Sequence, residues 1–341
     1  MHNQVTEILP NIYLIHLYQG KNEINIYLIK SEIGERSLMI DTGYQTPENR
    51  AILEEIFSDL KIRLTDLDVF LTHKHHDHTG IAAYLQSKGA RIFMNPLEDR
   101  HPYDCLYYGQ GPKAIEEQNT VLKRVGVTPS RTPDVYTGYK EFNAYYQNIG
   151  KNDSYKTRHF TYSPLKIGQT FIYGNYTFRT IPLPGHTLGQ LGLYDPARRI
   201  LFTGDQIIAH IVPIVGTSYV NEHLLSQYFQ SLEQIKTVYG RYTIYPAHGE
   251  IFKDSEPIIE RILSGYRKKL VAIQDVLTNS AKALTVQEIA FRVYGLYTLP
   301  SDVEKFFTVK SIITKTFSCL EYLYDQGYCE RMEQDGMLFY R

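Results

Sequence analysis

Cysteine is scarce in this chain, and its scarcity excludes two kinds of site. Cys105, Cys319 and Cys329 are the only cysteines among 341 residues. They are too few and too scattered for a disulfide framework or for a zinc site built on thiolates. Such cysteine usage is typical of a reducing compartment, and we therefore expect a cytoplasmic protein.

An excess of charge of either sign is also missing. The chain has 36 Lys and Arg residues against 37 Asp and Glu residues. This balance gives no electrostatic footprint for nucleic acid or for an anionic membrane surface. No uninterrupted apolar run approaches the length of a membrane span. The segment Met1–Val5 lacks the basic start of a signal peptide, so we expect neither a membrane segment nor a leader.

Short apolar or alternating runs predict a protein built largely from strands. The predicted strands are 12–15, 24–29, 38–40, 68–71, 91–94, 170–173, 176–181, 191–194, 200–202 and 242–245. Helical spacing predicts helices over 47–61, 81–88 and 224–239, the first of them started by Thr46-Pro47. Strands interleaved with helices favour helices packed on the outside of sheets.

Two further regions differ in character from this pattern. Residues 101–163 are polar and rich in tyrosine, with helical fragments such as 114–125, and we interpret them as a helical insertion. From residue 255 the chain becomes helical, with helices expected over 256–276, 285–294 and 309–326 and a strand at 337–340. We therefore expect two domains, 1–254 and 255–341.

The segment from Thr72 to Gly80 concentrates side chains that can bind a metal ion. His73, His75, Asp77 and His78 stand in the spacing H-x-H-x-D-H, directly after a predicted strand. Crowded imidazoles and a carboxylate desolvate one another unless a partner such as a cation binds them. In an extended loop, positions i and i+2 point the same way, so His73 and His75 can share one cation. A solvated polar loop is the alternative interpretation.

Four further segments each place a polar residue just after a predicted strand. They are Asp41 in Asp41-Thr42-Gly43, His186 in Gly185-His186-Thr187, Asp205 in Gly204-Asp205, and His248 in Ala247-His248-Gly249. The flanking glycines let the backbone turn sharply and bring the side chain inward. Any one of these segments alone would most simply be a turn. Nitrogen and oxygen ligands without thiolate suit Zn²⁺, Mn²⁺ or Fe.

In this order, the motifs resemble those of the metallo-β-lactamase-fold hydrolase superfamily over roughly residues 7–254. The resemblance implies an α+β fold, a four-layer αββα sandwich with a two-metal site along one edge of its sheets. His73, His75 and His186 would bind the first cation. Asp77, His78 and His248 would bind the second, and Asp205 would bridge the two. Asp41 would orient a ligand, or would only form a turn.

The identity of residue 205 narrows the resemblance. An aspartate at this position is similar to glyoxalase II, lactonases and the nuclease branches, whereas the best-known zinc β-lactamases carry cysteine there. Two divalent cations, most simply zinc, can hold a bridging hydroxide that attacks a small ester, thioester or lactone. Asp77 would help to orient this nucleophile, and His210 would be the proton donor to the leaving group or an ordinary loop residue. His76 falls in the unconstrained position of the motif, and we expect it not to be a ligand.

The insertion is where such enzymes build a substrate cap. Its candidate lining residues are Tyr107, Tyr108, Tyr145 and Tyr146, which could equally be structural tyrosines. The C-terminal domain resembles the winged-helix appendage of one branch of the superfamily. Its 11 basic and 11 acidic residues favour a structural or dimerisation role over RNA binding. A small molecule is the expected partner, and a homodimer is the expected assembly if the appendage dimerises.

Two alternative functions stay open on the sequence alone. A nuclease would use the C-terminal domain to hold single-stranded RNA, and its binding would weaken with salt. A mononuclear iron persulfide dioxygenase would use the ligands of the first metal together with Asp205. A binding module without catalysis is disfavoured, because every expected ligand is present.

Overall fold

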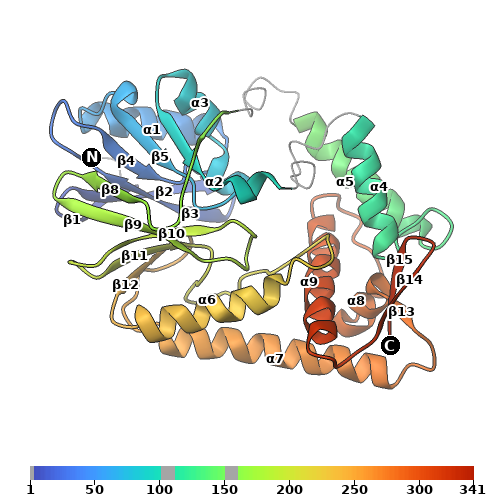
Figure 1. Cartoon of the computed structure of the whole chain (residues 1–341). Coiled ribbons are helices and arrows are strands. Elements are labelled where there is room, and N and C mark those ends of the chain that lie inside the picture. Colours follow the sequence, from blue (N-terminus) through green and yellow to red (C-terminus); the bar gives the residue numbers. More distant parts are fainter. Residues whose placement is uncertain (1–3, 101–111, 150–159) are drawn as a thin grey trace. The chain divides into compact units, whose positions relative to one another are not determined.

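The computed structural model describes residues 4–100, 112–149 and 160–341 (Figure 1). The chain forms two compact units, each assembled from three separate stretches of sequence. The first unit consists of Met1–Arg100, Gly150–Ile211 and Ser231–Ile259. The second consists of His101–Ile149, Val212–Gln230 and Glu260–Arg341. The division into domains at residue 254 stays a prediction.

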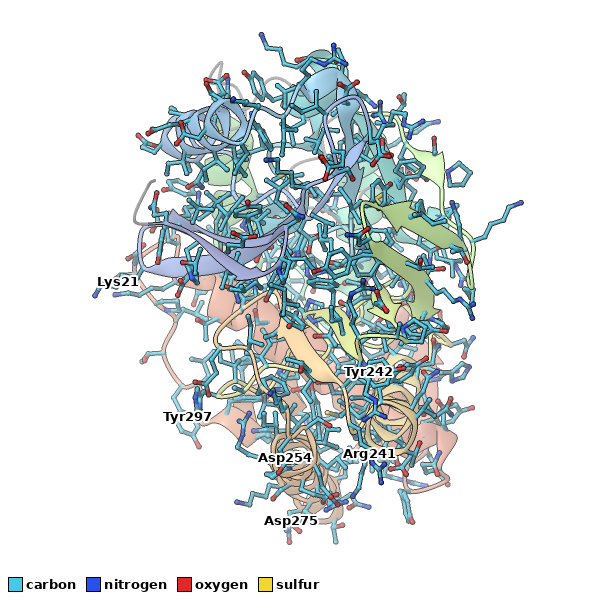
Figure 2. The ribbon with its side chains drawn as sticks, turned by 90° about the vertical axis from the view of Figure 1, so that its left-hand side faces the viewer. Lys21, Arg241, Tyr242, Asp254, Asp275 and Tyr297 are labelled. Atoms are coloured by element: carbon cyan, nitrogen blue, oxygen red, sulfur yellow. The ribbon has the colours of Figure 1, made fainter. Side chains whose placement is uncertain are left out.

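Sheet A of the first unit has seven strands in sequence order. They are β1 (Val5–Leu9), β2 (Ile12–Gln19), β3 (Asn22–Ile29), β4 (Ser37–Ile40), β5 (Leu67–Phe70), β6 (Arg91–Met94) and β7 (Ser163–Pro164). The strands β1 to β4 pair antiparallel, and β4 to β7 pair parallel. Figure 2 marks the β2–β3 turn by Lys21, whose side chain is exposed.

Sheet B of the first unit has five strands in the order β12-β11-β10-β9-β8. They are β8 (Thr170–Tyr173), β9 (Tyr176–Pro182), β10 (Leu191–Asp195), β11 (Ile200–Gly204) and β12 (Thr243–Pro246). A core of buried aromatic and aliphatic side chains joins the two sheets. Tyr27 of sheet A packs on Phe202 of sheet B with ring centroids 4.9 Å apart. The two sheets therefore form a sandwich around one apolar layer.

Helices cover the outer faces of the sandwich, as the expected αββα layering requires (Figure 1). The helices α1 (Pro47–Asp59) and α3 (Ala82–Ser87) share a second apolar core with sheet A. On sheet B, the end of α6 (Leu224–Val238) leads to Tyr239, whose ring contacts Tyr194 of β10. The 3-10 helices η1 (Leu64–Asp66) and η2 (Pro96–Asp99) lie just before β5 and after β6.

The second unit combines helices from the insertion with the C-terminal part of the chain. Its elements are α4 (Pro112–Arg124), α5 (Pro133–Ile149), most of α7 (Glu256–Thr278), β13 (Leu284–Thr285), α8 (Val286–Tyr294), α9 (Phe306–Asp325), β14 (Arg331–Gln334) and β15 (Met337–Tyr340). The three strands form sheet C in the order β13-β15-β14. The sequence of helix, strand, two helices and hairpin agrees with a winged helix, which stays a prediction.

The structure adds to or corrects the sequence-based prediction at three places. The stretch 133–149, part of the predicted helical insertion but not assigned bounds of its own, forms the single helix α5. The metal segment was expected to be extended, but Thr72–Lys74 form a bend, and Asp77 and His78 lie in the short helix α2 (His76–Thr79). The edge strand β1 was not predicted. None of the described helices is long and apolar enough to cross a membrane, and the cytoplasmic compartment stays a prediction.

Candidate metal centre

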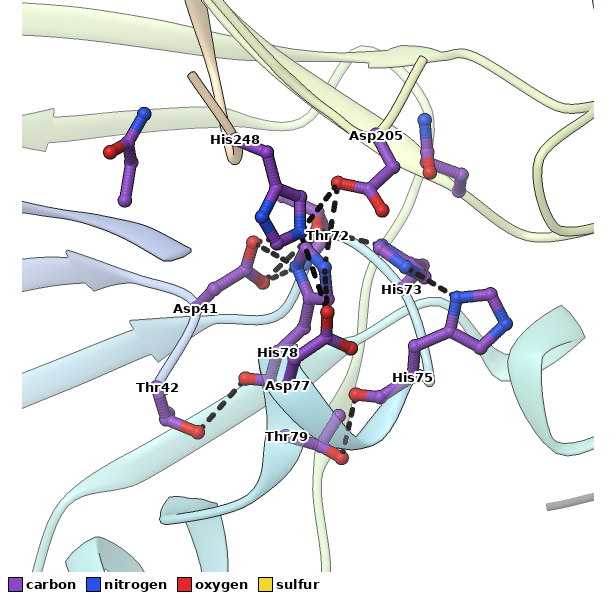
Figure 3. Close-up of polar contacts among 12 residues, drawn as sticks. Asp41, Thr42, Thr72, His73, His75, Asp77, His78, Thr79, Asp205 and His248 are labelled. Atoms are coloured by element: carbon purple, nitrogen blue, oxygen red, sulfur yellow. Dashed lines mark hydrogen bonds and ion pairs between the residues drawn. The ribbon is translucent and has the colours of Figure 1, made fainter. Parts of the chain in front are cut away.

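The candidate metal centre lies at one edge of the sandwich of the first unit, where several strands end. The pairs β4–β5 and β11–β12 are parallel, so the carboxyl ends of their strands lie side by side. Asp41 follows β4, the segment His73–His78 follows β5, Asp205 follows β11 and His248 follows β12. His186 comes from the loop that joins β9 to β10. This topology explains why residues far apart in the sequence meet here (Figure 3).

All the residues predicted as metal ligands fall into three overlapping groups of side chains. Within each group, the candidate ligand atoms lie within 4.8 Å of one another. The groups are His73, His75 and His186; His73, His78 and Asp205; and Asp77, His78 and His248. The first and third groups correspond to the two predicted ligand sets, and the second links them through Asp205. The structure brings these side chains together, and their metal-binding role is a proposal made below.

Two buried polar atoms at this centre have no hydrogen-bond partner among the described residues. They are His78 Nε2 and Asp205 Oδ1, which lie 3.5 Å apart. On the other side of the centre, His75 Nδ1 lies 2.9 Å from the Nε2 atoms of both His73 and His186. Buried polar groups normally have partners, so orphaned atoms beside converging imidazole nitrogens need an explanation. A donor set of this kind fits divalent cations.

Asp41 and Thr72 hold the histidines from behind. The Asp41 carboxylate accepts hydrogen bonds from the Thr72 backbone N–H at 2.8 Å and from the Thr72 hydroxyl. It also lies 2.8 Å from His78 Nδ1, which leaves His78 Nε2 directed toward the centre. Asp41 has a φ of 60°, a left-handed conformation that aspartate tolerates better than most residues. The prediction that Asp41 would form only a turn therefore misses its hydrogen bonds to the metal segment.

The charges at the centre divide it into two electrostatically different halves. Burial and then the neighbouring imidazole of His78 lower the pKa of His73 well below 6.5, which keeps its nitrogens neutral. Burial also opposes a charge on His78, but carboxylates, Asp41 first, raise its pKa well above 6.5. The pKa of His248 is likewise raised to about 9 against the effect of burial, chiefly by Asp205. The carboxylate half thus stabilises positive charge, and the other half offers neutral imidazoles.

The remaining residues predicted for the site lie apart from the three groups or outside the described residues. The ring of His76 packs on Tyr44, with centroids 5.6 Å apart. The side chain of His210 is 79% exposed, with Nε2 3.0 Å from Glu250 Oε1, and its role as a proton donor stays a prediction. Tyr145 donates a hydrogen bond to Glu304 within the second unit. Tyr107, Tyr108 and the side chain of Tyr146 lie outside the described residues, so the substrate cap stays a prediction.

Two residues that touch the ligand loops were missed by sequence reasoning. Thr72 stands directly before the H-x-H-x-D-H motif, but no role was predicted for its hydroxyl. Glu98 lies in η2, outside every motif, and accepts hydrogen bonds from residues next to three of the histidines. Nothing in the sequence around Glu98 indicates that its carboxylate contacts the loops of the histidines.

Comparison with known proteins agrees with the fold and with the place of the centre. The family model for the metallo-beta-lactamase superfamily matches residues 20–248, which include every residue of the three groups. Two solved structures superpose on nearly the whole chain. A metallo-beta-lactamase family protein from Thermus thermophilus is 21% identical, with a TM-score of 0.74 over 98% of this chain and 99% of the other. A beta-lactamase domain protein from Burkholderia ambifaria is 21% identical, with a TM-score of 0.75 over 98% and 93%.

Several fungal proteins are similar to this chain in sequence. The lactamase-like protein ptaB of Pestalotiopsis fici is 24% identical over 304 residues, covering 86% of this chain and 75% of its own. An atrochrysone carboxyl ACP thioesterase of Aspergillus novofumigatus is 26% identical over 280 residues, covering 80% of this chain and 66% of its own. A protein of the same name from Aspergillus fumigatus is 27% identical, covering 85% and 75%. The chain belongs to the metallo-beta-lactamase superfamily and is one of its hydrolases.

Proposed function

We propose that this hydrolase cleaves acyl thioesters with the help of two divalent cations. The observation that carries the proposal is the pair of orphaned buried atoms, His78 Nε2 and Asp205 Oδ1, at the junction of the three candidate ligand groups. The carboxylate of Asp205 favours positive charge nearby, the neutral form of His78 offers a lone pair at Nε2, and each atom lies among further nitrogen or oxygen donors. A hydrolase needs such a cluster, whereas the stability of a sandwich does not.

The residues themselves suggest how the cations would be held. His73, His75 and His186 would hold one cation, and Asp77, His78 and His248 the other, with Asp205 shared between them. Cations bound there would polarise the substrate carbonyl and make water a nucleophile near neutral pH. Zinc, manganese and iron all suit nitrogen and oxygen donors without thiolate.

Asp77 is the side chain that we propose to orient the attacking water. Its Oδ2 lies 3.4 Å from His248 Nε2 and 3.7 Å from His78 Nε2, and its side chain is 15% exposed. Burial opposes its ionisation, but the imidazole of His78 holds the pKa of the carboxyl well below its usual range. Asp77 is therefore ionised, and its carboxylate can accept a hydrogen bond from a water molecule at a position still reached by solvent.

The choice of a thioester rests on the leaving group and on the relatives. A thiol has a pKa near 8.5, so a thiolate leaves with less help from a proton donor than an alkoxide does. His210, the predicted donor, is exposed and lies beside Glu250, which makes a reaction independent of it the simplest one. The named function of two fungal relatives is the hydrolysis of a thioester to an acyl carrier protein.

A matched substrate panel tests the proposal. An S-acyl pantetheine analogue, the oxygen ester with the same acyl group, a lactone and a single-stranded RNA would be incubated with protein that has been reconstituted with zinc or manganese. We expect release of thiol with a kcat/KM at least tenfold above that of the oxygen ester, and loss of this activity after chelation. Cleavage of RNA with an intact thioester would replace the proposal by the nuclease hypothesis.

A further inference from the structure

Glu98 is a buried carboxylate that is held by hydrogen bonds. The residue is 2% exposed, and the hydrogen bonds that its carboxylate accepts from the described residues come from two backbone N–H groups and one hydroxyl. Burial raises the pKa of its carboxyl, which reflects an unfavourable environment for its charge. A protein that needed only packing at this position would be more stable with an apolar side chain.

The hydrogen bonds of Glu98 all come from the two loops that carry the three-histidine group. Its Oε2 accepts from the Lys74 backbone N–H at 2.8 Å, and Lys74 stands between His73 and His75. Its Oε1 accepts from the Thr187 hydroxyl at 2.8 Å and from the Gly189 backbone N–H at 2.6 Å. Thr187 follows His186 directly. One carboxylate therefore connects the backbone on both sides of the candidate metal position.

The neighbouring residues reinforce this connection and depend on close approach. Asn95, at the start of η2, donates a hydrogen bond from Nδ2 to the Gly189 carbonyl at 2.7 Å. A Cβ atom at Gly189 would lie 2.7 Å from Glu98 Oε1 and 2.9 Å from the Glu98 backbone nitrogen. Only glycine at position 189 allows the loop that carries His186 to come this near to η2.

We infer that Glu98 is a positioning residue that fixes the separation of the His73–His75 loop from the His186 loop, and so sets the affinity of the three-histidine group for its cation. The inference rests on the metal-binding function proposed above. A residue that bonds the loops behind metal ligands orients those ligands, and its loss typically weakens metal binding by about 10- to 100-fold. Glu98 does not touch the candidate ligand atoms themselves.

The test compares Glu98→Gln with a matched control, Asp195→Asn. Asp195 is also buried, at 0% exposure, and its carboxylate accepts from the backbone N–H groups of Ala197 and Arg198 at 2.8 and 3.0 Å. It is the last residue of β10, at the end opposite to the His186 loop. Both variants replace one carboxylate oxygen by an amide N–H₂, and Asp195→Asn also loses the charge that pairs with the Arg198 guanidinium at 3.0 Å, so both should lower the melting temperature of the metal-free protein. Only Glu98→Gln should weaken the metal site.

The measurement is the affinity of each metal-free variant for Zn²⁺ by chelator competition, together with the visible spectrum of the Co²⁺-substituted protein. In Glu98→Gln we expect the Zn²⁺ affinity of one of the two sites to fall by about 10- to 100-fold and the Co²⁺ spectrum to change. In Asp195→Asn we expect the Zn²⁺ affinities and the Co²⁺ spectrum of the parent. Equal affinities in the parent and Glu98→Gln would overturn the positioning role and leave the proposed function standing. A parent that binds no metal would overturn both.

A second variant covers the case in which Glu98→Gln does not fold. Gly189→Ala keeps the charge and the carboxylate but places a methyl group where it forces Glu98 and the loop apart. We expect the same selective weakening of one metal site. An unchanged affinity in folded Gly189→Ala would show that the spacing of the loops does not matter to the site.

Discussion

The two ends of β5 carry two buried polar clusters that are built in opposite ways. At its start, the Asp68 carboxylate accepts two hydrogen bonds from Arg91, at 2.7 and 2.6 Å, and one from Arg36 at 2.7 Å. Tyr173 of β8 adds its hydroxyl at 2.9 Å and so ties sheet B to sheet A. After its end, the cluster around His78 keeps orphaned atoms.

The two clusters differ in whether the chain itself supplies a partner for every buried polar atom. Around Asp68, cations and a hydroxyl supplied by the chain satisfy a carboxylate that is 2% exposed. Around His78, imidazoles and carboxylates crowd together, and His78 Nε2 and Asp205 Oδ1 find no hydrogen-bond partner among the described residues. A strand can therefore use one end for the stability of the sandwich and the other for binding a group from outside.

The largest expected effect comes from removing the shared carboxylate at the incomplete end. Asp205→Ala should lower kcat/KM by about 10³-fold or more, since a metal-assisted step is worth several kcal/mol and each 1.36 kcal/mol is tenfold in rate. It should also remove one equivalent of bound metal, measured by elemental analysis. A variant with full activity would rule out the two-metal mechanism.

At the complete end, the corresponding change should act on stability alone. Asp68→Asn should lower the free energy of unfolding by about 2 to 3 kcal/mol, less than for a fully buried pair because the Arg91 side chain is 55% exposed. Denaturant titration of the metal-free protein measures this loss. Metal content per folded chain should stay at the parent value, and a loss of metal in Asp68→Asn would mean that the two ends are not independent.

Removing the metal should lower stability only through the incomplete cluster around His78, and not through the cluster around Asp68. A ligand at a hundred times its Kd adds about 2.7 kcal/mol to the free energy of unfolding, and chelation should take this amount away. Because free-energy changes at distant sites add, chelation should lower the free energy of unfolding of the parent and of Asp68→Asn by equal amounts. Thermal unfolding with and without chelator in both proteins measures the comparison, and unequal losses would count against it.

The smallest expected effect is on how stability changes with pH, through Tyr173 in the cluster around Asp68. Burial, and then the charge of Asp68, raise the pKa of Tyr173 far above 10.0, so the folded state holds this proton more tightly than the unfolded chain does. The resulting stability is fully present below pH 10 and is lost as the pH rises above it. Tyr173→Phe should cost about 1 kcal/mol at neutral pH and should flatten the alkaline loss of stability. An unchanged alkaline slope would show that Tyr173 does not titrate against Asp68.

The strands and the metal cluster could be predicted from the sequence because their signals are local. Apolar alternation gave β6 and β8 with the bounds that the structure has, Arg91–Met94 and Thr170–Tyr173. The spacing H-x-H-x-D-H and the glycine-flanked residues at strand ends identified the side chains that the structure brings together.

What the sequence did not predict depends on contacts between distant residues. The helix α5 contains Gly138, whose missing side chain leaves room for the ring of Phe306 from α9. The predicted helical insertion did not include this contact, because no local pattern around Gly138 identifies Phe306 as its partner. The contact of Glu98 with both ligand loops joins residues 24 and 91 positions apart, which no local pattern reports.

The metal content of protein purified without added metal tests the central claim most directly. Elemental analysis per chain should find close to two equivalents of zinc, manganese or iron in the parent, and close to two in Asp68→Asn. Asp205→Ala should hold fewer. A single iron per chain would point to oxygen-dependent thiol chemistry instead, and a fully active protein that holds no metal would contradict the claim.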